Sequence, residues 1–110
     1  MTSTSSNVVV KLGTSSLTDA DGVIDTAFID RVAAELAELR AAGHRVTLVS
    51  SGAIAAGLPA LNLDASARPT DAVALQAISS IGQPTLLETW RRAFAPVSYT
   101  HLTLPTILLV

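Results

Sequence analysis

The residues near the start of the chain that are best suited to chemistry are Lys11 and the run Gly13, Thr14 and Ser15 that follows it. A glycine lets the backbone approach a ligand closely, and the amides and hydroxyls after it can donate hydrogen bonds to phosphate oxygens. A lysine just before them would bring a positive point charge to the same ligand. The pattern therefore predicts a phosphate site, although a lysine that reaches water at the end of a strand, followed by an ordinary turn, would use the same residues.

A second run of small residues occupies positions 50–57 and contains Ser51, Gly52 and Ala53. Small residues at a strand-to-helix junction leave the first amides of the helix exposed, and their partial positive charge attracts a carboxylate or a phosphate. A tight turn into a short helix that packs through alanine and glycine would have the same composition. Both interpretations stay open from these residues alone.

The elements that must position the two runs form a strand–helix–strand unit. Residues 8–12 are an apolar, β-branched run of the kind that is buried on both faces of a parallel sheet. Apolar residues then recur at three- and four-residue spacing, which predicts an amphipathic helix that begins at a cap on Asp25 or Thr26 and ends at Gly43. Residues 46–49 predict a second, parallel strand. We expect both runs of small residues to emerge side by side at the carboxyl edge of the sheet, where α/β proteins bind ligands.

A second helical stretch is predicted to begin near Thr70 and Asp71. Because proline cannot donate the helical hydrogen bond, Pro84 is expected to kink this helix or to divide it in two. Trp90 and Phe94 follow at helical spacing, and we expect them to lie in the core rather than at a ligand.

The composition favours a single folded α/β domain and excludes several classes of function. The chain has 110 residues, 49% of them hydrophobic, and a net charge of −2, which offers no electrostatic footprint for nucleic acid or an anionic membrane. It has no cysteine and two histidines, and Asp19 and Asp21 fit a solvated loop better than a cation site, so no metal site is predicted. With neither a signal peptide nor a membrane span, the expected location is the cytoplasm, with residues 1–6 disordered.

Three strings occur in the order VVVKLGTSSL at 8–17, VSSGAIAAG at 49–57 and QAISSIGQ at 76–83. Together they resemble the N-terminal part of the glutamate 5-kinases, a family of the amino-acid kinase superfamily, over residues 7–96. The resemblance implies part of a three-layer αβα fold. It also implies transfer of a phosphoryl group from Mg-ATP to the γ-carboxylate of L-glutamate, the first step of proline biosynthesis, by an intact enzyme that is a homo-oligomer.

The same resemblance implies roles for individual residues. Lys11 matches the lysine that contacts ATP and steadies the transferring phosphoryl group, and it is the candidate catalytic residue. Gly13, Thr14 and Ser15 match the loop that lines the phosphates. The run 51–53, which comprises Ser51, Gly52 and Ala53, matches the glutamate-binding loop.

Residues 97–110 do not continue the family pattern, and they look like the one-frame translation of a transposon-end adapter used in preparing sequencing libraries. We expect this tail to be foreign, although residues 103–110 are apolar enough to pair with a strand. Since the family's adenine pocket and further glutamate ligands are missing, we expect the chain itself to be inactive. Two other interpretations stay open: another branch of the superfamily, such as an acetylglutamate kinase, aspartokinase or isopentenyl phosphate kinase, and a non-catalytic module that binds an amino acid.

Overall fold

The computed structural model describes residues 5–98 and 105–110. Most of the N-terminal segment predicted to be disordered, residues 1–4, and part of the tail, residues 99–104, lie outside the described residues. The elements follow one another along the chain as β1 (Asn7–Leu12), α1 (Thr14–Leu17), α2 (Thr26–Ala41), β2 (Arg45–Ser50), α3 (Ala53–Gly57), the 3₁₀ turns η1 (Leu58–Leu61) and η2 (Ala65–Ala67), α4 (Ala72–Ser98) and β3 (Thr106–Leu109).

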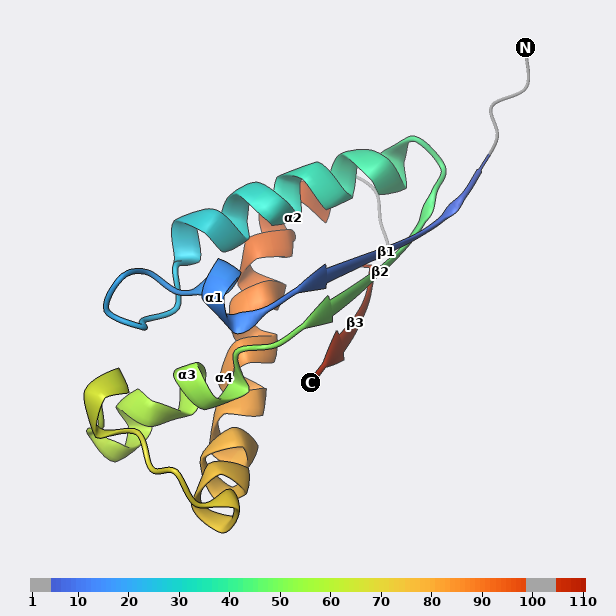
Figure 1. The fold of residues 1–110 in the computed structure, drawn as a ribbon. Helices are drawn as coiled ribbons and strands as arrows, with labels where there is room; N and C mark the ends of the chain where they lie inside the picture. The colour runs from blue at the N-terminus through green and yellow to red at the C-terminus, as the bar shows by residue number, and fades with distance from the viewer. Residues whose placement is uncertain (1–4, 99–104) are drawn as a thin grey trace.

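The sheet has three parallel strands in the order β1-β2-β3, and it confirms the predicted strand–helix–strand unit. In the register of β1 and β2, Lys11 lies beside Val49 and Leu12 beside Ser50. Both strands therefore end at the same edge of the sheet. Figure 1 shows α2 above the sheet and α4 crossing behind it.

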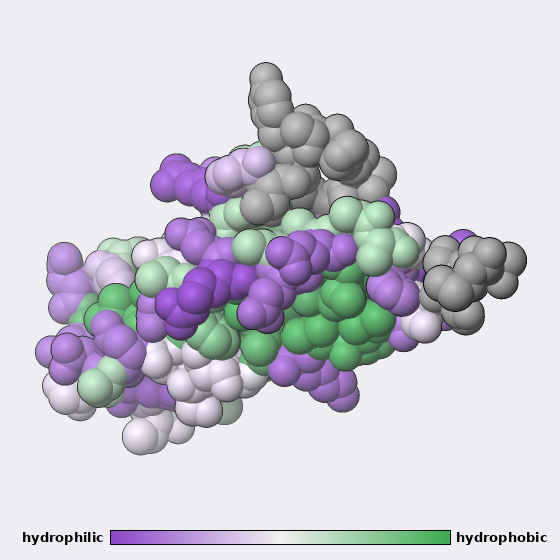
Figure 2. All heavy atoms as spheres, turned by 90° about the horizontal axis from the view of Figure 1, so that it is seen from above, coloured by the Kyte–Doolittle hydropathy of each residue, from purple (hydrophilic) through white to green (hydrophobic). Residues whose placement is uncertain are grey.

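Helix α2 begins and ends as its sequence predicts. The Asp25 carboxylate accepts a hydrogen bond from the Phe28 amide at 3.1 Å, which caps the N-terminus, and Gly43 takes a left-handed conformation (φ +98°) just beyond the C-terminus. Ile29 and Leu36 are buried on the inner side. The outer side carries a band of hydrophilic residues, which Figure 2 shows from above.

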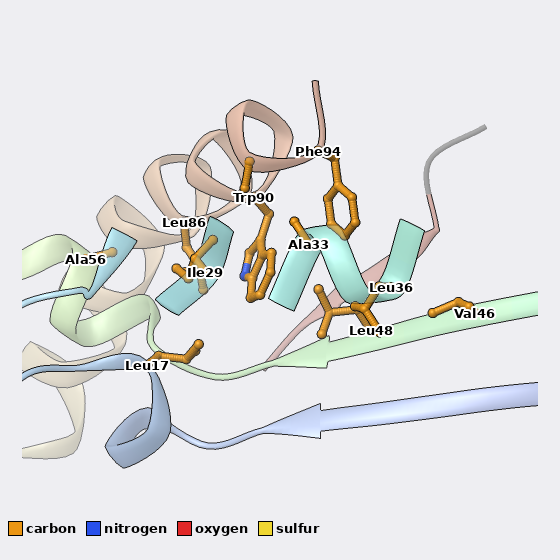
Figure 3. Packing of buried hydrophobic residues seen from close by; sticks show 11 residues of the cluster. Leu17, Ile29, Ala33, Leu36, Val46, Leu48, Ala56, Leu86, Trp90 and Phe94 are labelled. Carbon is orange, nitrogen blue, oxygen red and sulfur yellow. The ribbon is translucent and has the colours of Figure 1, made fainter. Parts of the chain in front are cut away.

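The core is formed by α2, α4 and the inner face of the sheet, with Trp90 at its centre (Figure 3). Trp90 and Phe94 are 0% and 1% exposed, and their ring centroids lie 6.0 Å apart. Leu48 from β2 and Leu86 from α4 are completely buried in the same cluster. The prediction that both aromatic residues belong to the core is confirmed.

The strands are covered on one face only in the part of the chain that the structure describes, although their apolar runs are typical of strands buried on both faces. Val8, Val10 and Leu12 pack against the core, whereas Val9 on the opposite face is 60% exposed. Leu108 and Val110, at 51% and 66%, are exposed as well. The physical reason is that both long helices, α2 and α4, contribute to one core on a single side of the sheet.

Helix α4 runs unbroken from Ala72 to Ser98 with Pro84 inside it, so the predicted division into two helices is wrong. Proline removes one helical hydrogen bond, that to the carbonyl of Ser80, but Ser80 is exposed and water can satisfy this oxygen. Ile78 before the proline and Leu86 after it are both buried. Packing on either side thus holds the helix together across the proline.

Within the predicted tail, residues 97–98 continue α4, and residues 106–109 extend the sheet as β3. Strand β3 pairs in parallel with β2, with Leu109 beside Ser50, and the Val110 amide donates to the Ser50 carbonyl at 2.9 Å. This is the pairing that the apolar composition of residues 103–110 allows. Within the described part of the chain, no helix combines the length and the hydropathy that crossing a bilayer requires.

Candidate functional site

The two runs of small residues meet at the carboxyl edge of the sheet. The Ser51 amide donates a hydrogen bond of 2.9 Å to the carbonyl of Leu12, so the start of the second run is tied to the last residue of β1. Gly13 follows Leu12 directly, and Gly52 follows Ser51. Residues almost forty positions apart in sequence are thereby brought to one place by two parallel strands that end together.

Lys11 projects from the uncovered face of the sheet. It is exposed, and it lies in register with Val49 on β2, which in turn lies beside Leu108 on β3. Among residues 5–98 and 105–110, Lys11 makes no ion pair. Its charge is therefore available to a ligand that approaches this face near the strand ends.

Gly13 keeps the backbone beside Lys11 open. Its φ of −80° is one that other residues adopt as well, and a Cβ atom added at this position would meet no atom within 4 Å. The glycine is thus required neither by backbone conformation nor by packing within the described chain, and it leaves the space that a phosphate would need. Thr14 and Ser15 follow it on the short helix α1, and both are exposed.

Gly52 has a different role, because it turns the chain from β2 into α3. Its φ of +109° is left-handed, which strains any residue with a side chain, and it is buried against Leu17 and Ile24. Ala53 is also buried, at 3% exposure, whereas Ser51 is half-buried. Of the three residues predicted to bind glutamate, Ser51 is therefore the most accessible in the described structure.

The chain matches the family model described as the amino acid kinase family over residues 7–108. The chain belongs to this family. Among curated relatives, the glutamate 5-kinase of Mycolicibacterium vanbaalenii is 43% identical over 106 residues, which cover 96% of this chain and 28% of the relative. Those of Salinispora arenicola and Bifidobacterium longum are 47% and 45% identical, with 93% and 86% of this chain covered and 26% and 24% of the relatives. The chain thus spans about a quarter of the length of the curated relatives it matches.

Two features that hold the second loop of this kinase-family chain were not predicted from its sequence. The indole Nε1 of Trp90 donates to the Ser50 hydroxyl at 3.0 Å, and that hydroxyl donates to the carbonyl of Ser51 at 2.9 Å. A second contact lies at the end of the loop, where a Cβ atom on Gly82 would overlap the carbonyl oxygen of Ala53. No pattern in the sequence around Ser50 or Trp90 indicates the first contact, because it forms only where the fold brings α4 to the end of β2.

The described residues contain no cluster of side chains that could hold a metal ion by themselves. No group of three or more histidine, aspartate or glutamate side chains that could hold a metal occurs in residues 5–98 and 105–110. The Asp19 carboxylate accepts the amides of Asp21 and Val23 at 2.8 and 3.1 Å, so it caps its own loop. The groups that the candidate site offers to a ligand are therefore a lysine, hydroxyls and backbone amides.

Proposed function

We propose that the intact protein to which this segment belongs is a glutamate 5-kinase. The observation that carries the proposal is the identity of 43–47% to glutamate 5-kinases over 86–96% of the chain, together with membership of the amino acid kinase family. The reaction is the ATP-dependent phosphorylation of the L-glutamate γ-carboxylate to glutamyl 5-phosphate, the first step of proline biosynthesis. We place the enzyme in the cytoplasm, with small molecules as its substrates.

In this proposal, Lys11 and the Gly13 loop serve the phosphates. A carboxylate oxygen of glutamate forms a bond to the γ-phosphorus of ATP, the bond from that phosphorus to the β–γ bridging oxygen breaks, and ADP leaves with the electron pair. Such transfers depend on positioning and on neutralising charge on the phosphoryl oxygens. An exposed lysine without an ion-pair partner in the described chain, beside an open glycine and two exposed hydroxyl residues, supports this role.

The second loop serves the acceptor in this proposal. The Ser51 amide and carbonyl are both engaged by neighbouring groups, Leu12 and Ser50, which leaves its hydroxyl to bind a ligand. Gly52 and Ala53 are buried and form the turn from β2 into α3 that follows Ser51. Because Lys11 lies one residue before the end of β1 and Ser51 directly follows β2, the phosphoryl donor and the acceptor would be held at neighbouring points of one sheet edge.

Ser51→Ala in the intact kinase is expected to raise KM for glutamate by about 10-fold, the effect of one lost hydrogen bond to a charged group. KM for ATP should stay within about 2-fold, because the first loop is untouched. Initial rates measured against each substrate in turn check this. Unchanged affinity for glutamate with weakened ATP binding would mean that the two loops have the opposite roles.

The 110-residue chain as written is expected to give no glutamate-dependent product. It carries two loops of the site, and it spans about a quarter of its full-length relatives. The assay incubates the purified chain with Mg-ATP, glutamate and hydroxylamine and measures hydroxamate, with a Lys11→Ala chain as the background. Product above that background would show that this segment is sufficient for catalysis.

We also propose that residues 97–110 are foreign to the kinase, which leaves 7–96 as its native part. The support is the adapter-like sequence of residues 97–106. The family model extends to residue 108, and residues 106–109 form β3, so this proposal is about origin and not about the capacity to form a strand. A genomic reading frame that runs without interruption through Thr106 would disprove it.

A further inference from the structure

The hydroxyl of Ser50 occupies an unusual place in the core. It lies on the inner face of β2, in line with the buried Val46 and Leu48, and it is 0% exposed. Within the described chain it is the one buried polar residue of the core. A buried hydroxyl is costly unless it is hydrogen-bonded, so an apolar residue would be the simpler choice for packing.

The Ser50 hydroxyl both accepts and donates a hydrogen bond, and the two bonds connect Trp90 to Ser51 in sequence. Its oxygen accepts from the Trp90 indole at 3.0 Å, and its proton goes to the Ser51 carbonyl at 2.9 Å. The indole is fully buried as well, and the bulk of its ring lies among apolar residues of α2, β2 and α4 (Figure 3). Because a single hydroxyl proton can point in one direction at a time, accepting from the indole favours donation toward Ser51.

Ser51 is thereby held from two sides. Its amide is bonded to Leu12 of β1, and its carbonyl is bonded through Ser50 to Trp90 of α4. These two bonds fix the peptide planes before and after Ser51, and with them the direction in which its side chain leaves the backbone. The end of the same loop rests on α4 too, since the carbonyl of Ala53 lies where a side chain on Gly82 would be.

We propose that Ser50 and Trp90 are positioning residues for the acceptor loop: the indole orients the Ser50 hydroxyl, and that hydroxyl fixes the Ser51 backbone so that Ser51 meets the acceptor carboxylate. This inference rests on the proposed function of Ser51. Neither residue touches a substrate. Their effect reaches the reaction only through the geometry of the loop.

The test uses the full-length kinase with the variants Ser50→Ala, Ser50→Thr, Trp90→Phe and the double variant Ser50→Ala/Trp90→Phe. Ser50→Ala should raise KM for glutamate by about 10-fold, the effect of one hydrogen bond, and leave KM for ATP within about 2-fold. Trp90→Phe should give a smaller rise of about 3-fold, because the Ser50 hydroxyl can still donate. Ser50→Thr keeps the hydroxyl and should restore the wild-type value.

The double variant distinguishes a relay, in which Trp90 acts on Ser51 through the Ser50 hydroxyl, from two separate structural effects. If Trp90 acts through Ser50, the double variant should have the same KM for glutamate as Ser50→Ala alone, which is a departure from additivity. The proposal would be overturned if the increases in KM for glutamate of the two single variants multiplied in the double variant. Equal increases in KM for glutamate and for ATP would overturn it as well. Should Ser50→Ala fail to fold, Trp90→Phe compared with wild type still decides, since an unchanged KM for glutamate in that variant also contradicts the relay.

A second measurement is independent of catalysis and separates failure of the relay from failure of the proposed function. Hydrogen exchange of the Ser51 amide, measured relative to the Leu48 amide in the middle of β2, should become about 10-fold faster in Ser50→Ala. If the wild-type enzyme did not phosphorylate glutamate, the proposed function would be wrong, and this exchange ratio would still test the relay. An unchanged ratio would show that Ser50 does not hold the Ser51 backbone.

Discussion

Replacing Lys11 by alanine in the intact kinase is expected to lower kcat by about 10²-fold or more, as for other preorganised groups that stabilise transition-state charge. The ammonium group lies on the open face of the sheet and makes no ion pair in the described chain, so its removal should not destabilise the fold. Steady-state kinetics and a thermal melt of the same preparation check both expectations. A preserved kcat with a raised KM for ATP would limit Lys11 to binding the ground state.

The matched control for this variant is Arg45→Ala. Arg45 is another exposed cation, but it begins β2 at the opposite end of the sheet from the two loops. The Arg45→Ala substitution removes one positive charge from the same sheet and should leave kcat within about 2-fold, since salt screens an exposed charge that lies far from the two loops. Equal losses in the two variants would mean that net charge, and not the position of Lys11, determines the rate.

Replacing Gly82 by alanine is expected to destabilise the protein by about 3 kcal/mol or more. The added Cβ would overlap the carbonyl of Ala53 and lie 2.7 Å from the Gly57 nitrogen, and both are backbone atoms that cannot rotate away. Helix propensity acts in the opposite direction, since alanine in a helix is favoured over glycine by about 1 kcal/mol. A net loss of stability therefore measures the close contact between α3 and α4.

Urea unfolding of the chain, followed by the fluorescence of Trp90, its one tryptophan, gives the free energy of unfolding for this test. Gly13→Ala is the control, because its φ is −80° and no atom lies within 4 Å of the new Cβ. It should change stability by less than about 1 kcal/mol, with a small gain from the stiffer unfolded chain. If both variants unfolded at the same urea concentration, the fit between α3 and α4 would not be tight enough to matter.

Much of the local structure could be predicted because it depends on neighbours in sequence. The cap on Asp25, the left-handed Gly43 and the alternation of helix and strand are determined by a few adjacent residues, and all three are found. The same holds for the burial of Trp90, which follows from its helical spacing to other apolar residues. Local patterns also place Lys11 and Ser51 at strand ends, and from there the topology brings the two loops together.

The errors and omissions concern contacts between residues far apart in sequence. The proline predicts a kink or a division of the helix at Pro84, but the helix is not divided, because burial of Ile78 and Leu86 on either side outweighs one missing hydrogen bond. The apolar strand of residues 8–12 does not indicate that one of its faces stays open, since that depends on where the helices pack. No local pattern relates Ser50 to Trp90 either, because their bond exists only once α4 lies across the end of β2.

The bond between Ser50 and Trp90 also has a consequence for the time course of synthesis. The two residues are 40 positions apart, and a ribosome adds about 5–20 residues per second, so about 2–8 s pass between their appearance. During this interval β1, α2 and β2 are already made, but the indole that fills their core is not. The core that these elements share with α4 can therefore close only after α4 has been synthesised.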